Sequence, residues 1–586
     1  MRQWMVAAKK ADFYAIAEKF HVDPVVARII RNREVIGEKN IRIYLGGNLS
    51  DLSDPHQMKD MDRLVEILAQ KIRKQVHIRI IGDYDVDGVT SSHLFLTALR
   101  RVGAKVDVVI PHRIQDGYGL SLHLLQQAKE DGVDTILTCD NGIAAIDEIA
   151  WAKAQKMTVL VTDHHAVPFE EHEGRRTEKK SLADAVVNPH QQDCGYPYKE
   201  LCGAGVAWNV IRVLYENYDM DKREAEDLLD FVAMATVCDV MSLTGENRIL
   251  VKEGLKRIRH TKNIGLQALM QACNVQPENI SAYHFGYVLG PCVNATGRLD
   301  TARHALRLFE TGQETEAEEI ARDLVDLNQE RKELTLQGVE MAKKLCEEGG
   351  YENDPVLVLF LPDVHESIAG LIAGRIREMY NRPVFVLTRG EEGVKGSGRS
   401  TENYSMYENM CGCAELFKKF GGHPMAAGLS LPEENVEKFR RKINENCPLT
   451  VEEVCPDIHI DMAMPVGYAS TELVHQFALL EPFGKDNPSP LFADRNLSIS
   501  RMWVIGKNRN VLRMSVLSEY GQPVPVIFFG DVETLFAYFT EKFGQEEVEN
   551  ALHGRKNRIL FSMVYTAKID FYQGNENLQL EMKYYR

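Results

Sequence analysis

The 586-residue sequence lacks the features that would place a protein in a membrane or outside the cell. No apolar run reaches the roughly 18 residues that a membrane-spanning helix needs. The N-terminal stretch MRQWMVAAKKADFYAIAEKF does not have the charged-then-apolar order of a signal peptide. The 11 cysteines are scattered, and the closest pairs, Cys194 with Cys202 and Cys411 with Cys413, do not have the partners of a zinc site or a disulfide framework. We therefore expect a cytoplasmic protein with reduced thiols.

A net positive charge is absent as well. The formal net charge is −16 and the pI is about 5.7, so no overall positive field attracts a polyanion. Any nucleic-acid site must therefore be a local basic groove on an acidic body. The chain is 44% hydrophobic and can bury several cores, and a prior of about 150 residues per domain predicts roughly three or four domains.

Apolar runs alternate with amphipathic helical segments between residues 76 and about 240. The runs are VHIRIIG, KVDVVIP, TILTCD, MTVLVTD and AVVNP. Near-continuous apolar strands separated by helices indicate a parallel sheet with helices on both faces. Functional groups are then expected at the carboxyl ends of the strands.

Acids and imidazoles follow three of these predicted strands. They are Asp83, Asp85, Asp87, Asp140, Asp163, His164 and His165. A further acid, Asp239, sits in the apolar helical stretch FVAMATVCDVMSL, where a charge needs a partner. Each aspartate alone could be only a helix cap or a turn former. Together they predict a metal site, because clustered like charges are costly unless cations neutralise them. Oxygen ligands with one or two imidazoles suit Mn²⁺ or Mg²⁺ better than zinc, and a bridging acid would make a two-metal centre for phosphoryl hydrolysis.

Several motifs resemble a known family. GDYDVDG, TCDNG and TDHH resemble the DHH phosphoesterase superfamily. CGAGVAW, ATVCDVM, NATGR, GSGRS and GGHPMAAG are similar to its RecJ family of single-strand-specific 5′ exonucleases, over about residue 40 to the C-terminus. The resemblance implies a DHH catalytic domain at residues 51–315, after an N-terminal helical arm at 1–50. A DHHA1 domain would follow at 351–456 and an OB-fold at 457–586.

The resemblance also assigns a two-ion site. Asp83, Asp85 and Asp140 would hold one Mn²⁺ or Mg²⁺ ion. The ligands of the other would be Asp87, Asp140, His164 and Asp239, so that Asp140 bridges the ions. His165 would face the scissile phosphate, and His165 and Arg298 would hold its non-bridging oxygens. Relatives in the superfamily often have a His two residues before Asp83, where this chain has Ile81.

The segment PHRIQDGYGLS and the motif NATGR are expected to contact nucleic acid. The resemblance implies that Arg113 and Tyr118 contact the nucleotide being cleaved, and that Asn294 and Arg298 belong to the backbone-binding segment. Without the resemblance, Arg113 and Tyr118 could belong to an ordinary surface loop with the Tyr packed over it. Asn294 could be only a helix cap and Arg298 a solvated side chain.

The sequence of the second half of the chain predicts three further structural parts. Residues 316–350 form a long charged helix that connects two domains. A smaller α/β unit follows, in which the resemblance places Ser397 and Arg399 on a terminal 5′ phosphate and His423 near the same cleft. A purely structural His423 remains the alternative. Short β-like runs from about residue 457 predict a small barrel.

Basic and aromatic residues are close together in this predicted barrel. They are Arg495, Arg501, Lys507, Arg509 and Arg513, with Trp503, Phe528 and Phe529. Such a surface suits an OB-fold that binds single strands by backbone charge and base stacking. The alternative is that the aromatics form the barrel core and the basic residues a solvated edge.

The expected function is a metal-dependent 5′ to 3′ exonuclease that hydrolyses single-stranded DNA to 5′ mononucleotides in DNA repair and recombination. The resemblance implies a monomer that cooperates with a RecQ-type helicase and a single-strand-binding protein. One rival is a phosphodiesterase acting on very short oligonucleotides or cyclic dinucleotides. The other is a nucleic-acid-binding scaffold whose catalytic centre has decayed.

Overall fold

The computed structural model describes residues 3–113, 116, 119–172, 175–390, 393–506, 510–572 and 574–586. These residues form two compact units, one made of Asn48–Pro456 and the other of Gln3–Gly47 together with Asp457–Arg586. Among the described residues, no helix combines the length and the apolar character needed to cross a membrane.

The first unit begins with a five-stranded parallel sheet. Its strand order is β3-β2-β4-β5-β8, and every pairing in it is parallel. The strands are β2 (His77–Ile81), β3 (Lys105–Val109), β4 (Thr135–Cys139), β5 (Thr158–Thr162) and β8 (Ala185–Val187). The alternation of apolar runs and helices predicted such a sheet, and this part of the expected fold class is confirmed.

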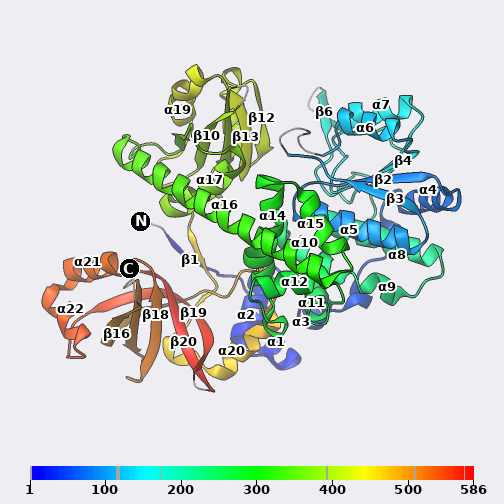
Figure 1. Cartoon of the computed structure of the whole chain (residues 1–586). Coiled ribbons are helices and arrows are strands. Elements are labelled where there is room, and N and C mark those ends of the chain that lie inside the picture. The colour runs from blue at the N-terminus through cyan, green and yellow to red at the C-terminus, as the bar shows by residue number, and fades with distance from the viewer. Residues whose placement is uncertain are drawn as a thin grey trace. The chain divides into compact units, whose positions relative to one another are not determined.

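Helices cover both faces of this sheet because its strands are apolar on both sides. Ile78 and Ile80 pack into a core with α5 (Val86–Arg101), α8 (Gly203–Asn217) and α10 (Leu229–Cys238). Ile136 and Val159 face the opposite side, toward α6 (Leu122–Glu130) and α7 (Ile146–Ala154). Figure 1 shows the two helix layers on either side of the strands. The carboxyl ends of all five strands therefore lie along one edge.

Several helices follow the sheet and lead into a second α/β part, and three of them matter for the site. They are α12 (Ile264–Ala272), α14 (Gly290–Leu299) and the 35-residue α16 (Glu314–Glu348). The first half of α16 buries Ile320 and Leu324 in the core around α5, and its second half buries Val339 and Ala342 in the next core. The long green helix in Figure 1 thus packs against both α/β parts of this unit.

The second sheet has five mostly antiparallel strands in the order β12-β13-β11-β10-β9. They are β9 (Leu357–Phe360), β10 (Val384–Gly390), β11 (Gly393–Arg399), β12 (Lys419–His423) and β13 (Ala426–Leu431). Helix α17 (Ala369–Tyr380) and α16 pack on one face, and α18 (Met406–Cys411) and α19 (Val436–Glu445) pack on the other. This is the smaller α/β domain expected from the sequence.

Five strands of the other unit pair in a closed ring. Strand β16 pairs with both β17 and β19, β17 pairs with β18, and β20 pairs with both β18 and β19. The bounds are Phe492–Ile505 for β16, Val511–Leu517 for β17, Pro523–Phe529 for β18, Leu560–Tyr572 for β19 and Asn575–Tyr585 for β20. Because the ring is closed, each of the five strands pairs with a neighbour on both sides.

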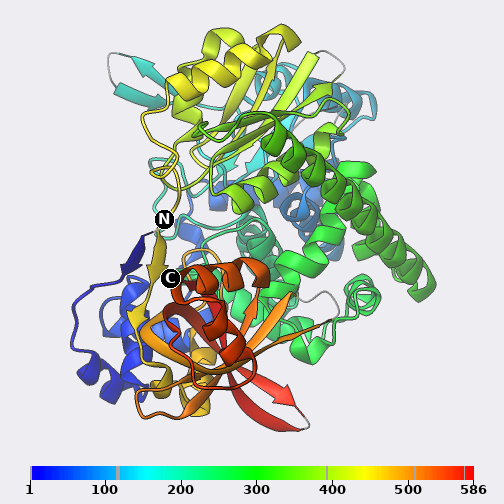
Figure 2. The same ribbon diagram turned by 90° about the vertical axis from the view of Figure 1, so that its left-hand side faces the viewer.

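The N-terminal segment is part of this same unit. Strand β1 (Trp4–Val6) pairs in parallel with β14 (Ile458–Ile460), and α1 (Phe13–Phe20), α2 (Pro24–Asn32) and α3 (Glu38–Gly46) share one core with the ring of strands. Arg33 forms a buried bidentate ion pair with Asp461, at 2.6 and 3.0 Å. Figure 2 shows the blue N-terminal helices beside the yellow-to-red C-terminal segments. The sequence pattern did not indicate this association.

Candidate metal centre and substrate cleft

The turn between β2 and α5 positions the first carboxylates. Asp85 is the N-cap residue of α5, and its carboxylate accepts the N–H of Gly88 at 3.0 Å. The carboxylate of Asp87 accepts two backbone N–H groups at the start of α8, from Gly203 at 2.6 Å and from the next residue at 2.7 Å. A helix N-terminus favours an anion. A Cβ on Gly203 would lie 2.6 Å from the Cβ of Asp140, which explains the glycine in the CGAGVAW motif.

Groups from three further segments converge on this turn. The Nε2 atom of His164 lies 3.1 Å from Asp140 Oδ1, 3.6 Å from Asp239 Oδ2 and 3.7 Å from Asp87 Oδ2. Three sets of side chains place their ligand atoms within 4.8 Å of one another: Asp83, Asp85 and Asp140; Asp87, His164 and Asp239; and Asp140, His164 and His165. Asp140 belongs to two of the sets. The structure thus brings together all six residues predicted as metal ligands.

The electrostatics of the cluster favour a bound cation. Burial first, and then neighbouring carboxylates, raise the pKa of Asp83, Asp85 and Asp140. Burial lowers the pKa of His164, which leaves the neutral imidazole that a metal ligand requires. The Oδ1 atom of Asp83 and the Nε2 atom of His164 are buried and make no hydrogen bond with a described group. These orphaned atoms and the mixed oxygen and nitrogen donors fit Mn²⁺ or Mg²⁺.

Asp163 holds the second histidine of the DHH triplet in place. Its Oδ1 atom lies 2.7 Å from Nδ1 of His165 and also accepts the backbone N–H groups of His164 and His165, while Oδ2 accepts the N–H of Ile143 at 2.9 Å. Burial alone would lower the pKa of His165, but the hydrogen bond and charge of Asp163 raise it to about 9. The sequence alone places Asp163 at a strand end and indicates no role for it. Its position directly before two histidines was the available signal.

Guanidinium groups lie beside the acidic cluster. Arg113 stacks over the ring of Tyr84, with its Cζ 4.7 Å from the ring centroid, and Tyr84 stands between Asp83 and Asp85 in sequence. Arg298 of α14 donates to the carbonyl of Ser367 at 2.6 Å. Burial lowers the pKa of Arg298 to about 10, and the charges of Arg113, Arg331 and Arg399 add to this effect. Arg331 of α16 is a basic residue near this cleft that the sequence analysis did not identify.

A cavity of about 290 Å³ lies next to these guanidinium groups. It is lined by Tyr84 and Arg113 on the DHH side and by Thr388, Lys395 and Ser397 of β10 and β11 on the other. Arg399 donates to the Oγ atom of Ser397 at 3.2 Å. Among the described residues, none of Arg113, Arg298 and Arg399 pairs with a carboxylate. Unpaired guanidinium groups in a cleft suit a phosphate chain.

The structure places the other residues predicted to contact nucleic acid in different surroundings. Tyr118 lies outside the described residues. Asn294 is inside α14, where its Oδ1 accepts the N–H of Val86 at 3.1 Å, so it fastens α14 to the start of α5. His423 is exposed at the end of β12, and Ala426 of β13 is in register with both His423 and Arg399. Two strand spacings, or about 10 Å, therefore separate the backbones of His423 and Arg399.

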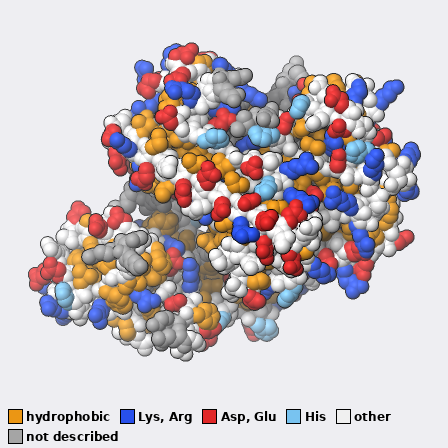
Figure 3. Space-filling model, viewed as in Figure 1, with side chains coloured by type: hydrophobic (Ala, Val, Ile, Leu, Met, Phe, Trp, Pro, Cys, Tyr) orange, Lys and Arg blue, Asp and Glu red, His pale blue; other side chains and the backbone are white. Residues whose placement is uncertain are grey.

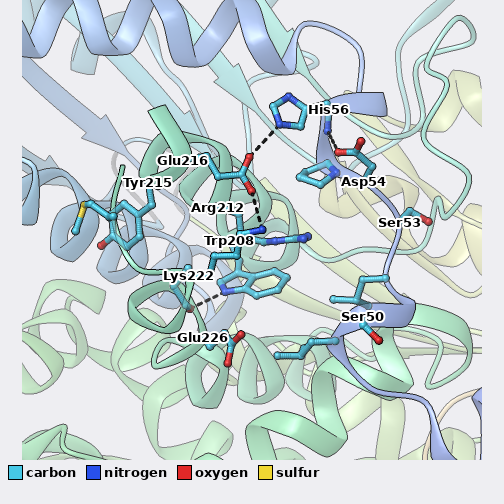
Figure 4. A pocket seen from close by; sticks show the side chains of 15 residues that line it. Ser50, Ser53, Asp54, His56, Trp208, Arg212, Tyr215, Glu216, Lys222 and Glu226 are labelled. Carbon is cyan, nitrogen blue, oxygen red and sulfur yellow. Dashed lines mark hydrogen bonds and ion pairs between the residues drawn. The ribbon is translucent and has the colours of Figure 1, made fainter. Parts of the chain in front are cut away.

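A second cavity, of about 600 Å³, lies between residues 49–56 and α8. Figure 4 shows its polar groups turned toward one another. His56 contacts Glu216 at 3.1 Å, the indole of Trp208 donates to a backbone carbonyl at 2.7 Å, and Arg212 lies 4.9 Å from the Trp208 ring centroid. None of the metal-competent sets found in the described part of the chain includes a residue of this cavity.

The surface carries charges of both signs. Figure 3 shows Asp and Glu side chains interspersed with Lys and Arg over the face in view. Binding of a nucleic-acid strand would therefore depend on local contacts, such as those of Arg113, Arg298 and Arg399.

The parallel sheet, the acid and imidazole cluster and the attached α/β part define a DHH-type phosphoesterase. The family model described as "DHH family, N-terminal domain" matches residues 77–236, "DHHA1 domain" matches 353–447, and "RecJ OB domain" matches 460–584. The chain belongs to the RecJ family of single-stranded-DNA-specific exonucleases. The family membership that the motifs predicted is thereby confirmed.

Two relatives support this assignment, and one solved protein shares the fold. The single-stranded-DNA-specific exonuclease RecJ of Haemophilus influenzae is 32% identical over 582 residues, which cover 96% of each chain. That of Bacillus subtilis is 33% identical over 87% of this chain, and this chain spans 63% of its length. RecJ from Thermus thermophilus, solved with Mn²⁺, aligns with a TM-score of 0.79 at 24% identity, covering 100% of this chain and 79% of that one. The same protein solved with Mg²⁺ gives a TM-score of 0.75.

Proposed function

We propose that this chain is a metal-dependent exonuclease that hydrolyses single-stranded DNA from its 5′ end to 5′ mononucleotides, in DNA repair and recombination. The observation that carries the proposal is the adjacency of two kinds of groups. The acid and imidazole cluster meets the cleft of unpaired guanidinium groups at Tyr84, whose ring lies under Arg113 while Asp83 and Asp85 flank it in sequence. Phosphodiester hydrolysis needs such a site, with cations on one side and a grip on the backbone on the other.

The cluster would hold two divalent ions. Asp83, Asp85 and Asp140 would ligate one, and the other would have the ligands Asp87, Asp140, His164 and Asp239. When bound, such a pair of ions supplies a nucleophile at neutral pH and stabilises the charge that develops on the phosphate. The convergence of these side chains within 4.8 Å supports the assignment, and Asp140 is suited to bridge because it belongs to two of the sets.

Side chains around the cluster would orient the scissile phosphate. The Nδ1 atom of His165 lies 2.7 Å from Asp163, which orients the imidazole, and His165 would donate to a non-bridging oxygen of the phosphate. Arg298 would hold a second oxygen, because its guanidinium lies beside Arg113 and Arg399 with no carboxylate partner among the described residues. Ser397 and Arg399 would bind the terminal 5′ phosphate in the cavity of about 290 Å³.

The ring of β-strands in the other unit would bind single-stranded DNA. Trp503 and Phe529 are 37% and 57% exposed, and the guanidinium of Arg501 lies 5.7 Å from the Trp503 ring centroid. Exposed aromatic and basic side chains support base stacking and backbone contacts. Phe528 is 7% exposed and belongs to the core, as the alternative interpretation expected. Lys507 and Arg509 lie outside the described residues.

The rival functions fit the chain less well. The match of residues 460–584 to an OB domain counts against a phosphodiesterase for very short oligonucleotides, because such an enzyme does not need this domain. A scaffold with a decayed centre has no need for six intact ligands in one cluster. A cytoplasmic location stays a prediction from the sequence features. A monomeric state and cooperation with a RecQ-type helicase and a single-strand-binding protein stay predictions from the family resemblance.

Digestion of a long single strand labelled at either end, with Mn²⁺ and a duplex control, tests the proposal. We expect stepwise release of the 5′ label as a mononucleotide by the wild-type protein, and none by Asp140→Ala. Release from the 3′ end, or cleavage only of very short oligonucleotides, would favour the phosphodiesterase. Binding without cleavage would favour the scaffold.

A further inference from the structure

Cys273 and Cys292 face each other where three helices meet. Cys273 is the C-cap residue of α12, Cys292 lies in the first turn of α14, and their Sγ atoms are 3.7 Å apart. Asn328 of α16 donates to the Sγ of Cys292 at 3.3 Å. No other two thiols are in contact among the described residues. The sequence carries no signal for this pair because 19 positions separate its members.

The surroundings of Cys292 favour its thiolate. The amide of Asn328 donates to its sulfur, the thiol of Cys273 can do so too, and the positive charges of Lys332 and Arg331 lie nearby, while the protonated thiol of Cys292 can donate to the carbonyl of Val288 at 3.3 Å. Cys273 first, and then Asn328 and the two positive charges, lower the pKa of Cys292 although burial opposes them. Cys292 is only 2% exposed, but Cys273 is half-buried, so a small oxidant can reach the pair from its side. Thiolate character and access together decide how readily cysteines oxidise.

We propose that Cys273 and Cys292 form a dithiol that a peroxide oxidises to a disulfide. One thiolate attacks hydrogen peroxide, forming an S–O bond as the O–O bond breaks and hydroxide leaves. The second sulfur then attacks the sulfenic acid, the S–S bond forms as the S–O bond breaks, and a second hydroxide leaves. The two hydroxides take up the two thiol protons. Two thiols and one peroxide thus give one disulfide and two waters, and a thiol reductant reverses the modification.

The local backbone can accommodate the bond. A disulfide requires the sulfurs to approach to about 2.05 Å, so the present separation of 3.7 Å must shorten. Cys273 ends its helix and is followed by Asn274 in a left-handed conformation. Cys292 follows the π-helical turn Phe285–Leu289, and π-helical turns are local irregularities that often occur at functional sites. Neither sulfur is therefore in the middle of a regular α-helix.

The modification would act on the substrate cleft through α14. Asn294 and Arg298 lie on the same helix as Cys292, and Asn328 would lose its contact to the sulfur if Cys292 moved toward Cys273. Misplacement of a positioning element by about 1 Å can cost about 10²-fold in rate. We expect oxidation to slow single-strand cleavage at least about tenfold. This consequence rests on the proposed function, whereas the formation of the disulfide does not.

Peptide mapping tests the modification itself. The full-length protein is treated with increasing hydrogen peroxide, its remaining thiols are blocked with N-ethylmaleimide, and it is digested with trypsin and an endoprotease that cleaves after Glu. Residues 263–298 contain both cysteines without an internal Lys or Arg, and Glu278 separates them. We expect the fragments 263–278 and 279–298 to stay linked, lighter by two hydrogen atoms, until dithiothreitol is added. The proposal would be overturned if both cysteines still react with N-ethylmaleimide at a peroxide dose that oxidises the exposed Cys411.

Activity measured on the same samples tests the coupling to α14. Wild type should lose at least about tenfold in rate and recover with dithiothreitol. Cys273→Ser should keep its basal rate and resist peroxide, and Cys411→Ser should behave as wild type. A linked protein with full activity would refute the coupling. Formation of the linked peptide does not depend on activity, so failure of the proposed nuclease function would be recognised separately.

Discussion

The carboxylate of Asp163 lies 2.7 Å from Nδ1 of His165, and the same Oδ1 atom accepts the backbone N–H of His165 at 3.0 Å. The ring and its backbone are thus held by one oxygen. A carboxylate that accepts from Nδ1 fixes the orientation of the imidazole ring.

Asp163→Asn should impair catalysis more than binding. The amide cannot accept the imidazole proton as the carboxylate does, so we expect a fall of about 10²-fold in turnover with little change in single-strand affinity. Single-turnover kinetics and fluorescence anisotropy measure the two quantities. The same substitution made on top of His165→Ala should cost little more. If the two losses multiply instead, Asp163 does not act through His165.

Arg399→Ala should narrow the rate difference between 5′-phosphorylated and 5′-hydroxyl single strands. Arg399 is half-buried beside Ser397 at the cleft, and a guanidinium there would bind the terminal phosphate. Arg389→Ala is the matched control, since Arg389 lies on the neighbouring strand β10 and is exposed, with Glu433 as its partner. An unchanged ratio for Arg399→Ala, or an equal effect of Arg389→Ala, would count against this role.

Asp461→Ala should destabilise the unit that joins residues 3–47 to the C-terminal strands. It would leave the guanidinium of Arg33 buried without its charge partner, at a cost of about 3–5 kcal/mol. Hydrogen exchange should speed up in both α2 and β14. Glu34→Ala is the control, because Glu34 is 63% exposed and its ion pairs with Lys9 and Arg31 lie at the surface. Unchanged exchange in α2 would show that the pair does not hold the segment.

Added Mn²⁺ should raise the melting temperature more at about pH 8 than at about pH 5.5. The pKa values of Asp83, Asp85 and Asp140 lie above their ordinary values because of burial and then mutual repulsion. In the metal-free protein these acids contribute stability while protonated, and that contribution is lost as pH rises through their raised pKa values. The ions replace the protons, so their effect grows with pH. Calorimetric scans with Mn²⁺ or a chelator measure it, and an equal shift at both pH values would contradict the explanation.

The sequence predicts those parts of the site that follow from strand periodicity. The acids after β2, β4 and β5 are brought together because parallel strands share one carboxyl edge, and Asp239 was identified as a charge in an apolar helix. For Asp163 the sequence offers only its position before two histidines, since its role depends on which way its side chain turns after β5. The pairing of β1 with β14 was not predictable, because three-residue strands more than 450 positions apart carry no periodic signal. The Cys273–Cys292 contact depends on how three helices pack, which local pattern does not specify.

Mn²⁺ binding, counted by titration calorimetry and electron paramagnetic resonance, tests the two-ion centre most directly. The measurement compares wild type, Asp140→Asn and the control Asp147→Asn, whose side chain is exposed in the first turn of α7. We predict two magnetically coupled ions on wild type and on Asp147→Asn, and loss of the coupling with at least one ion on Asp140→Asn. Two coupled ions of unchanged affinity on Asp140→Asn, or no bound Mn²⁺ on wild type, would contradict the assignment.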